Sequence, residues 1–506
     1  MISQGTNIKV LVIGLDGATF DVIYPLIRRG KLPTFSKLLK IGCHGRLKSI
    51  FPPWSAPAWV SLVTGKNPGK HSVFAFFVLK SMSYNEIDSV VNSKCIKSKT
   101  IWNILSAVGK KVIIINVPVT YPPCPVNGIL VSGFLTPSPS CEFTYPRWFK
   151  KFLKRYKIDI SGAFKYITVP IPSMNLNKLY NELLDMLEAR KELVITLLKT
   201  LKWDFFMVVF MTLDRVQHFF WHTHENKAEH TDIVSEFYSK IDVMLSEILK
   251  LVDENTIVMI VSDHGFGRAP RKLFHVNTWL VNLGLLRLKR SILLRMRVII
   301  LGLLRKISTP LIEILGNFIK RLSISLSEKL RNAVMWSETS ITKVINWSET
   351  IAYGSIFGIR INLKGKKPKG VVEPDKYEKI REFIIRKLMQ VEDPETNSKV
   401  VKIALKREDM YKGMFTALAP DIIIMLNDDY RLSLTLESNC ITKRPFRLPT
   451  GDHRAHGIFI VFGKGIRQGV DLNEVSILDI APTILHIMGI PIPKDMDGQV
   501  IKELFE

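Results

Sequence analysis

Residues 9–17 read KVLVIGLDG, a nearly unbroken apolar run that ends in an aspartate and a glycine. A short continuous apolar run predicts a strand that is buried on both faces of a sheet. Two further runs have the same form, WDFFMVVFMTLD at residues 203–214 and TIVMIVSD at residues 256–263. Because α/β sheets place their sites at the carboxyl ends of the strands, we expect Asp16, Asp214 and Asp263 to converge there.

The surrounding sequence alternates between strand and helix patterns, as in a doubly wound sheet. KVIIINVP at 111–118 and GIFIVFG at 457–463 predict further strands, and SILDIAPTILHIMGI at 476–490 predicts a closing helix. Residues 179–202 and 233–252 repeat apolar side chains every three or four positions, which indicates amphipathic helices. The predicted fold class is therefore α/β, with a mixed, mostly parallel sheet between helices. Because the candidate site residues extend from Asp16 to His453, residues 1–506 are expected to form a single catalytic domain.

Two segments interrupt this alternation. Residues 118–176 are rich in proline, serine and aromatic residues without a steady period, which predicts a cap or loop region over the site. Residues 285–334 are expected to form a basic helical insertion, since residues 281–334 contain eleven Lys and Arg but only two Glu. This insertion would either pack its apolar face on the body, or use residues 285–331 to lie on an anionic membrane surface or to form a dimer arm.

The composition limits the classes of protein that this chain can be. The net charge of +25 favours an anionic partner, but over a third of the excess lies in the basic insertion. No apolar stretch approaches the ~18 residues of a membrane span, and no signal core precedes the first strand. The five cysteines form no CxxC pair, which argues against a zinc knuckle or a disulfide framework. We therefore expect a cytoplasmic protein, peripheral at a membrane if the insertion binds one, with no specific nucleic-acid partner.

Aspartate and histidine recur in motifs that can supply metal ligands. Asp214 and His218 in LDRVQH stand four apart, so they share one face of the predicted helix. Asp263 and His264 are neighbours in VSDHG, and GDHRAHG offers two imidazoles, His453 and His456. Such oxygen and nitrogen ligands suit zinc, with manganese as the alternative. Two divalent ions close together can clamp both oxygens of an in-line displacement at phosphorus.

Such chemistry also needs a nucleophile, and Ser55 in PPWSAPAW is the candidate. A hydroxyl in front of a helix that opens at Ala58 or Trp59 would feel the positive helix end as well as the metal. On its local sequence alone, Ser55 could equally be a plain helix N-cap.

The order of these motifs resembles the alkaline phosphatase superfamily, most closely its type I phosphodiesterase and nucleotide pyrophosphatase branch. The order is a strand with Asp16, the Ser55 loop, TGKNPGKH at 64–71, then LDRVQH, SDHG and GDH before a strand. The resemblance spans residues 9 to about 498 and implies an alkaline-phosphatase-like fold with two metal ions. It also implies a covalent seryl intermediate. The implied ligands are Asp16, Asp263 and His264 for the metal that activates Ser55, and Asp214, His218 and His453 for the second metal.

Two positions depart from the branch pattern. The nucleophile is Ser55 where nucleotide pyrophosphatases usually have threonine, and Phe76 stands where they have an asparagine that holds a phosphate oxygen. The sulfatase branch is disfavoured, because it needs a CxPxR or SxPxR loop and this chain has SAPAW. The leading hypothesis is cleavage of a phosphodiester or pyrophosphate bond in a small-molecule phosphoester substrate, and a phosphomonoesterase or phosphotransferase is the alternative. A basic membrane-surface protein with a vestigial site is the alternative from another class.

Overall fold

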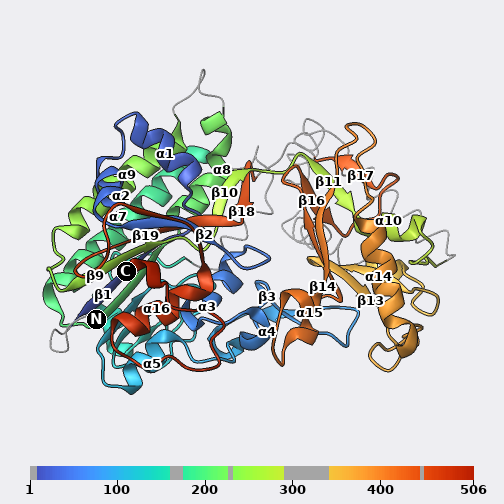
Figure 1. The fold of residues 1–506 in the computed structure, drawn as a ribbon, viewed down its shortest axis with the longest axis horizontal. Helices are drawn as coiled ribbons and strands as arrows, with labels where there is room; N and C mark the ends of the chain where they lie inside the picture. The colour runs from blue at the N-terminus through green and yellow to red at the C-terminus, as the bar shows by residue number, and fades with distance from the viewer. Residues whose placement is uncertain (1–7, 160–174, 226–231, 290–340, 445–448, 506) are drawn as a thin grey trace, which may run out of the picture.

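The computed structural model describes residues 8–159, 175–225, 232–289, 341–444 and 449–505, and its fold is built on a central sheet of nine strands (Figure 1). Strand β1 (Lys9–Leu15) lies in the middle of this sheet and pairs in parallel with β8 (Phe205–Phe210) and β9 (Thr256–Val261). These are the three apolar runs predicted as buried strands, and every residue of β8 and β9 is buried. Their carboxyl ends therefore lie side by side.

The other strands extend the sheet on both sides of this centre. Beyond β8 lie β5 (Val112–Ile115), β6 (Gly128–Val131) and the antiparallel β7 (Thr144–Tyr145). Beyond β9 lie the antiparallel β19 (His456–Phe462), then β2 (Cys43–Lys48) and β20 (Val470–Ser476). Parallel pairs outnumber antiparallel ones, so the sheet is mixed and mostly parallel, and the predicted α/β class is confirmed.

Helices cover both faces of the sheet (Figure 1). Alternate residues of β1 pack on the two faces of the sheet, because successive side chains of a strand point to opposite sides. Leu11, Ile13 and Leu15 enter one hydrophobic core, and Val10 and Val12 enter the other. The first core includes α1 (Phe20–Arg28), α2 (Pro33–Ile41), α7 (Leu176–Thr200), α8 (Thr212–Glu225) and α9 (Ile233–Leu249), and the second includes α3 (Ser55–Thr64), α5 (Ile101–Ala107) and α16 (Ile480–Ile487).

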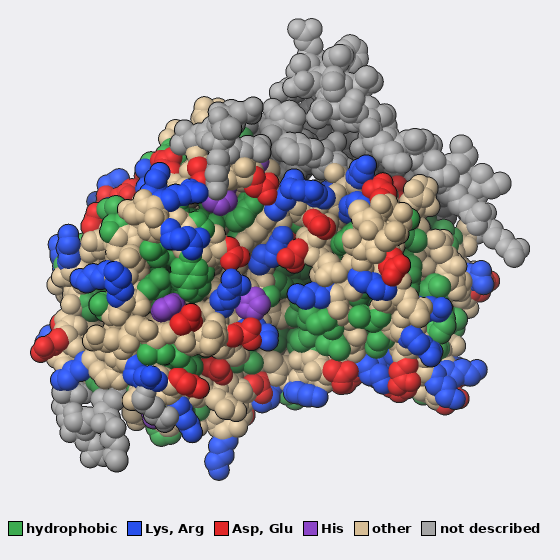
Figure 2. Space-filling model, turned by 45° about the horizontal axis from the view of Figure 1, so that its top comes forward, with side chains coloured by type: hydrophobic (Ala, Val, Ile, Leu, Met, Phe, Trp, Pro, Cys, Tyr) green, Lys and Arg blue, Asp and Glu red, His purple; other side chains and the backbone are tan. Residues whose placement is uncertain are grey.

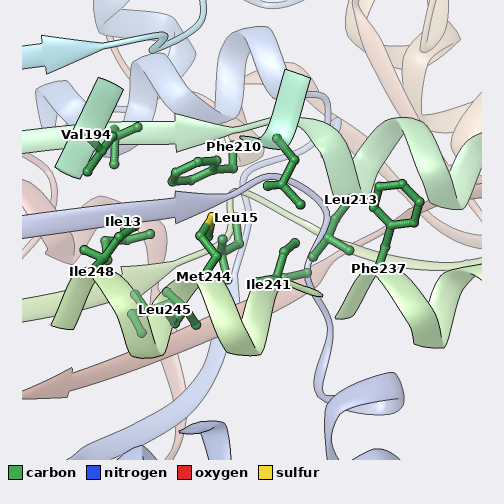
Figure 3. Packing of buried hydrophobic residues seen from close by; sticks show 14 of the residues in the cluster. Ile13, Leu15, Val194, Phe210, Leu213, Phe237, Ile241, Met244, Leu245 and Ile248 are labelled. Atoms are coloured by element: carbon green, nitrogen blue, oxygen red, sulfur yellow. The ribbon is translucent and has the colours of Figure 1, made fainter. Parts of the chain in front are cut away.

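The first core shows how these helices are held. Figure 3 shows the α9 side chains Ile241, Met244, Leu245 and Ile248 packed against the strand residues Ile13 and Leu15. The spacing of the four α9 residues follows the helical period, so one face of α9 is apolar and the opposite face is polar. Full burial of each such side chain contributes roughly 1.5–3 kcal/mol to folding. Both faces of β1 are held in this way, so the position at which β1 ends is well defined.

The predicted cap region is wrong for part of its length. Within residues 118–176, β6 and β7 are strands of the central sheet, and β6 pairs in parallel with β5. Residues Ile129, Leu130 and Val131 are buried there, because this short run continues the two-sided apolar pattern of β5. The proline-rich and serine-rich sequence on either side made this four-residue strand difficult to recognise. Residues 160–174 of the predicted cap lie outside the described residues.

A second lobe lies at the carboxyl side of the sheet and has a hydrophobic core of its own (Figure 1). It contains a four-stranded and a three-stranded sheet with helices packed against them. Residues 290–340 of the predicted basic insertion lie outside the described residues, so its role and the single-domain organisation stay predictions. The elements of the lobe are β11 (Lys272–His275), α10 (Val276–Asn282), β12 (Ala352–Ser355), β13 (Gly358–Ile361), α14 (Tyr377–Leu388), β14 (Val401–Lys406), β15 (Ile422–Leu426), β16 (Tyr430–Ser433) and β17 (Ile441–Lys443).

A hairpin links the second lobe to the lobe that contains the central sheet. Its strands are β3 (Phe77–Leu79) and β4 (Ile87–Val90). The Tyr84 hydroxyl donates to Asn362 Oδ1 at 2.8 Å, and Glu86 forms an ion pair with the buried Arg360. On the face drawn in Figure 2, blue Lys and Arg side chains are spread among red Asp and Glu rather than gathered in one patch. No helix within the described ranges is long and apolar enough to cross a membrane.

Candidate metal centre

The predicted site residues lie where the three central strands end. Asp16 directly follows β1, Asp263 stands two residues after β9, and Asp214 is in the first turn of α8, which begins two residues after β8. His218 is one helical turn further along α8, so it lies on the face of Asp214 as predicted. The last histidine, His453, lies far from the other site residues in the sequence. Strand β18 (Gly451–Arg454) pairs antiparallel with β10 (Gly265–Arg268), and this pairing brings His453 opposite Phe266.

Ser55 lies within a first group of ligand-type side chains. Its Oγ is 3.4 Å from Asp16 Oδ1 and 3.3 Å from His264 Nε2. His264 Nε2 is in turn 3.5 Å from Asp16 Oδ1 and 3.3 Å from Asp263 Oδ2. Asp16, Asp263 and His264 are fully buried, and Ser55 is 2% exposed. A hydroxyl, two carboxylates and an imidazole therefore share one small space that is closed to bulk water.

A second group adjoins the first. His453 Nε2 lies 3.2 Å from Asp214 Oδ1 and 3.0 Å from His218 Nε2, and His218 Nε2 lies 3.4 Å from Asp214 Oδ1. The rings of His264 and His453 stack with their centroids 3.8 Å apart, so the two groups share a boundary. The structure thus brings together all seven residues that the sequence assigns to the site, although they span 438 positions from Asp16 to His453.

Backbone carbonyls fix the tautomers of all three imidazoles. Nδ1 of His218 faces the Gly451 oxygen at 3.1 Å, Nδ1 of His453 faces the Pro53 oxygen at 2.9 Å, and Nδ1 of His264 faces the Gly265 oxygen at 3.1 Å. A carbonyl only accepts hydrogen bonds, so each Nδ1 must carry the proton and donate. In its neutral form each ring then turns the lone pair of its Nε2 into the site. Hydrogen bonds of this kind commonly orient histidine ligands of metals.

Burial disfavours the charged forms of the titratable side chains in the first group. It raises the pKa of the Asp16 carboxyl well above its ordinary value, and the negative charge of Asp214 adds to the rise. Burial also raises the pKa of Asp263 well above its ordinary value, reinforced by Asp16 and Asp214, and it lowers the pKa of His264. For Asp214 the same burial is outweighed by His218, His453 and Arg215, which together hold the pKa of this carboxyl low. The cluster therefore lacks positive charge around Asp16 and Asp263.

These features fit a divalent-metal site. One ligand atom from each of Asp16, Asp263 and His264 lies within 4.8 Å of the others, and the same holds for Asp214, His264 and His453. Asp263 Oδ2 is buried and accepts no hydrogen bond among the described residues. When both rings are neutral, the Nε2 lone pairs of His218 and His453 face each other at 3.0 Å, an arrangement that a cation bound between them stabilises. Bound cations would supply the missing charge and use every one of these lone pairs.

The position of Ser55 corrects the predicted start of its helix. Helix α3 begins at Ser55 rather than at Ala58 or Trp59, and its N-cap residue is Trp54, so Ser55 is not the N-cap. The hydroxyl stands in the first helical turn, where the unpaired backbone N–H groups make the surroundings positive. The α3 residue Trp59 donates from Nε1 to Asp16 Oδ2 at 2.8 Å. Its ring crosses β1 at Gly14, where an ideal Cβ would lie 2.5 Å from Trp59 Cη2, so only glycine fits there.

Other basic and imidazole side chains close to the site motifs in the sequence lie outside this cluster. Lys66 pairs with Asp495, and Lys70 lies 2.5 Å from Asp497, so neither turns its charge toward Ser55. His456 begins β19 and meets Glu474 at 2.9 Å. Gly265 begins β10, where any side chain would collide with the carbonyl oxygen of His456.

Sequence reasoning missed two side chains that border the cluster. Trp59 could have been found from its position one helical turn after Ser55. Arg215 follows Asp214 and lies 3.3 Å from the Asp214 carboxylate, with its guanidinium 4.6 Å from the ring centre of Phe134. No local signal marks Arg215, because an arginine that follows an aspartate in a helix usually faces solvent.

Solved structures with the same fold include phosphorus-handling enzymes. Murine ectonucleotide pyrophosphatase/phosphodiesterase 5 is 14% identical, with a TM-score of 0.54 and coverage of 98% of this chain and 100% of that chain. An inactive variant of it, solved in complex with AMP, matches equally well. Phosphonoacetate hydrolase from Sinorhizobium meliloti, in complex with phosphonoacetate, is 14% identical, with a TM-score of 0.54 and 96% coverage of both chains. At this identity the likeness shows the fold alone, and it confirms the alkaline-phosphatase-like architecture.

Two sequence comparisons cover very different shares of this chain. A putative extracellular sulfatase Sulf-1 homolog of Caenorhabditis elegans is 49% identical over 47 residues, which is 9% of this chain and 7% of that protein. So short a match carries no conclusion about the whole chain. The family model for type I phosphodiesterase/nucleotide pyrophosphatase, by contrast, matches residues 10–458, which include every site residue described above. This chain therefore belongs to the type I phosphodiesterase/nucleotide pyrophosphatase family of hydrolytic enzymes, as the order of its motifs predicted.

Proposed function

We propose that this protein is a metal-dependent hydrolase that cleaves a phosphodiester or pyrophosphate bond through a covalent intermediate on Ser55. The single observation that carries this proposal is the position of Ser55 Oγ, 3.4 Å from Asp16 Oδ1 and 3.3 Å from His264 Nε2 at the start of α3. A buried serine between a carboxylate and an imidazole, at a positive helix end, is the arrangement that an activated nucleophile requires. Family membership supports the same reaction class.

Two divalent ions are part of this proposal, zinc before manganese, because the ligands combine histidine nitrogens with carboxylate oxygens. Asp16, Asp263 and His264 would hold the ion next to Ser55. Asp214, His218 and His453 would hold the second ion, and the boundary position of His264 between the two groups lets it approach both. Ions bound there would favour the ionised serine and stabilise negative charge on the attacking and leaving oxygens.

The side chains of this chain would divide the reaction as follows. Ser55 Oγ gives its proton to solvent and bonds to phosphorus, and the P–O bond to the leaving oxygen on the opposite side breaks. The leaving group departs with the electron pair of the broken P–O bond. A water molecule then loses a proton to solvent and bonds to the phosphorus in line. The P–Oγ bond breaks, and the Ser55 oxygen leaves with the electron pair and takes up a proton from solvent. Trp59 holds Asp16 in place throughout by its 2.8 Å hydrogen bond.

The proposed substrates are small phosphoesters, with nucleotide diesters and pyrophosphates first. AMP bound to the murine ectonucleotide enzyme and phosphonoacetate bound to the hydrolase both contain a tetrahedral phosphorus group. Beside Ser55 the partly buried rings of Trp54 and Phe76 stack with centroids 6.2 Å apart, and Phe357 closes against Trp54 edge-on. An aromatic surface at this position suits the base or another flat leaving group. The complete ligand set supports an active site rather than a vestigial one.

A comparison of two chromogenic esters tests the proposal. The zinc-loaded and manganese-loaded protein should release nitrophenol faster from a nitrophenyl nucleotide diester than from nitrophenyl phosphate, and chelation should stop both reactions. A large preference for the monoester would replace the diesterase proposal by the phosphomonoesterase or phosphotransferase alternative. Absence of turnover on every diester, pyrophosphate and monoester tested would refute the proposed function. Cytoplasmic location and contact with an anionic membrane stay predictions.

A further inference from the structure

One positive group at the edge of the metal centre has unused hydrogen-bonding capacity. Arg215 is 8% exposed, and its Nη1 lies 3.3 Å from Asp214 Oδ2. Its Nη2, bonded to the same carbon, is buried and donates to no partner among the described residues. A buried charged donor without an acceptor is rare, because burial removes the water that would otherwise satisfy it. The unpaired Nη2 therefore leaves Arg215 able to donate to an acceptor from outside the chain.

The surroundings of Arg215 show where such an acceptor would lie. The guanidinium faces the ring of Phe134 at 4.6 Å, and Phe134 meets Phe76 edge-on at 6.0 Å. Phe76 stacks on Trp54, the residue before Ser55. Arg215 thus lies between the metal-ligand cluster and the aromatic side of the site.

We propose that Arg215 binds a non-bridging oxygen of the reacting phosphoryl group through Nη2. This proposal rests on the proposed function, since it assigns one contact of that same site. Phe76 has no side-chain donor for such an oxygen, and Lys66, Lys70 and Arg454 are paired with Asp495, Asp497 and Asp428. The planar guanidinium can hold Asp214 with one nitrogen and a phosphate oxygen with the other, which an ammonium group on a lysine cannot do equally well.

The charge of Arg215 has a consequence for substrate preference. A monoester dianion carries one more negative charge on its non-bridging oxygens than a diester does. A fixed cation beside those oxygens stabilises the dianion more strongly than a neutral amide would. Removal of Arg215 should therefore lower kcat/KM for a monoester by a larger factor than for a diester.

Inorganic phosphate is the probe that tests this contact without turnover. Calorimetric titration of phosphate into the zinc-loaded protein should show binding that weakens at least tenfold in Arg215→Gln and less in Arg215→Lys. Turnover by Arg215→Ala should fall about 10²–10³-fold, as for loss of one oxyanion donor, and added guanidinium should restore part of it. Zinc content measured by mass spectrometry should equal that of the wild type in all three variants. Arg381→Lys is the matched control, because Arg381 is also buried and ion-paired but lies in α14 of the second lobe.

The outcomes separate this inference from the proposed function. Wild-type affinity for phosphate in Arg215→Gln would overturn the Arg215 contact while leaving the Ser55 reaction intact. Parallel loss of zinc and phosphate in all three variants would also overturn it, because Arg215 would then only support Asp214. Weakened phosphate binding with normal zinc content would support the contact even if no diester were turned over.

Discussion

The metal-ligand cluster and the aromatic wall formed by Trp54, Phe76, Phe134 and Phe357 are two sides of one candidate site, and they are built differently. The cluster consists of short polar side chains fixed at strand ends, and each imidazole is held by a backbone carbonyl. The wall consists of rings from distant segments that meet at centroid distances of 6.0–6.2 Å. The first region has the geometry that chemistry at a metal requires, and the second forms a surface that a substrate can contact.

This difference predicts that the metal-ligand cluster determines the reaction class and that the aromatic wall determines the substrate preference. Hydrogen bonds and buried strands leave the ligand side chains few alternative positions, so replacement of one should disrupt the site as a unit. Ring contacts are weaker and less directional, so the wall tolerates change at lower cost. Substitutions in the cluster should therefore act on metal content and rate by orders of magnitude, and substitutions in the wall should act on preference by small factors.

The largest effect is expected for Ser55→Ala. Turnover should fall on the order of 10⁴–10⁶-fold, because the nucleophile is lost while the ligand set is unchanged. Quench-flow and steady-state assays with a nitrophenyl nucleotide diester measure the rate, and mass spectrometry measures zinc content. Ser61→Ala is the matched control on α3, because Ser61 is fully buried and contacts His71 rather than the cluster. Equal losses in the two variants would mean that α3 packing, and not the Ser55 hydroxyl, is needed.

The second-largest effect is expected for replacement of His453, which β18 contributes to the cluster. His453→Ala should reduce the bound metal from two ions to one and slow turnover at least ~10²-fold, because a ligand lone pair that the Pro53 carbonyl orients is lost. His456→Ala should change neither quantity, since His456 pairs with Glu474 at the surface. Dialysis against a zinc buffer followed by metal analysis gives the stoichiometry. Two ions in His453→Ala would remove His453 from the proposed ligand set.

The contrast between these regions also explains what the sequence could predict. Asp16, Asp214 and Asp263 were predictable because each follows an apolar run whose two-sided burial is a local property. The order of the motifs then supplied His453, although it lies 190 residues beyond Asp263. Arg215 and Phe134 were not predictable as a pair, because their contact depends on how α8 meets the segment after β6. The start of α3 was misplaced for a related reason, since Trp54 caps it without any side-chain hydrogen bond and leaves no recognisable motif.

His71 sharpens the comparison, because it belongs to the TGKNPGKH motif yet contacts neither side of the site. Its Nδ1 accepts from the Val73 amide at 3.2 Å, and its Nε2 meets Ser61 Oγ at 2.8 Å beneath α3. Burial lowers the pKa of His71 to about 3. Since the unfolded chain binds this proton near pH 6.5, the stabilisation from His71 is complete above that pH and is lost as the pH falls toward 3.

Measurement of unfolding against pH tests this role. Wild-type protein without metal should lose on the order of 4 kcal/mol between pH 6.5 and about 3 through His71, and His71→Gln should lack this part of the slope. The free energy of unfolding comes from urea titrations at each pH. Ser61→Ala, which keeps the imidazole, should retain the slope. An identical slope in His71→Gln would show that other groups cause the acid sensitivity.

The smallest effect is expected for Phe76→Asn, which places an amide where the family resemblance implies one. Loss of the contacts with Trp54 and Phe134 should lower stability by roughly 1–3 kcal/mol. In the wild-type background, diester turnover should change only a few-fold, because Arg215 would already hold the phosphate oxygen. In the Arg215→Ala background the same substitution should restore part of the lost kcat/KM, and more for the diester than for the monoester. A gain of ten-fold or more in the wild-type background would contradict this reasoning, because it would show that the phosphate oxygen lacked a donor until the amide was supplied.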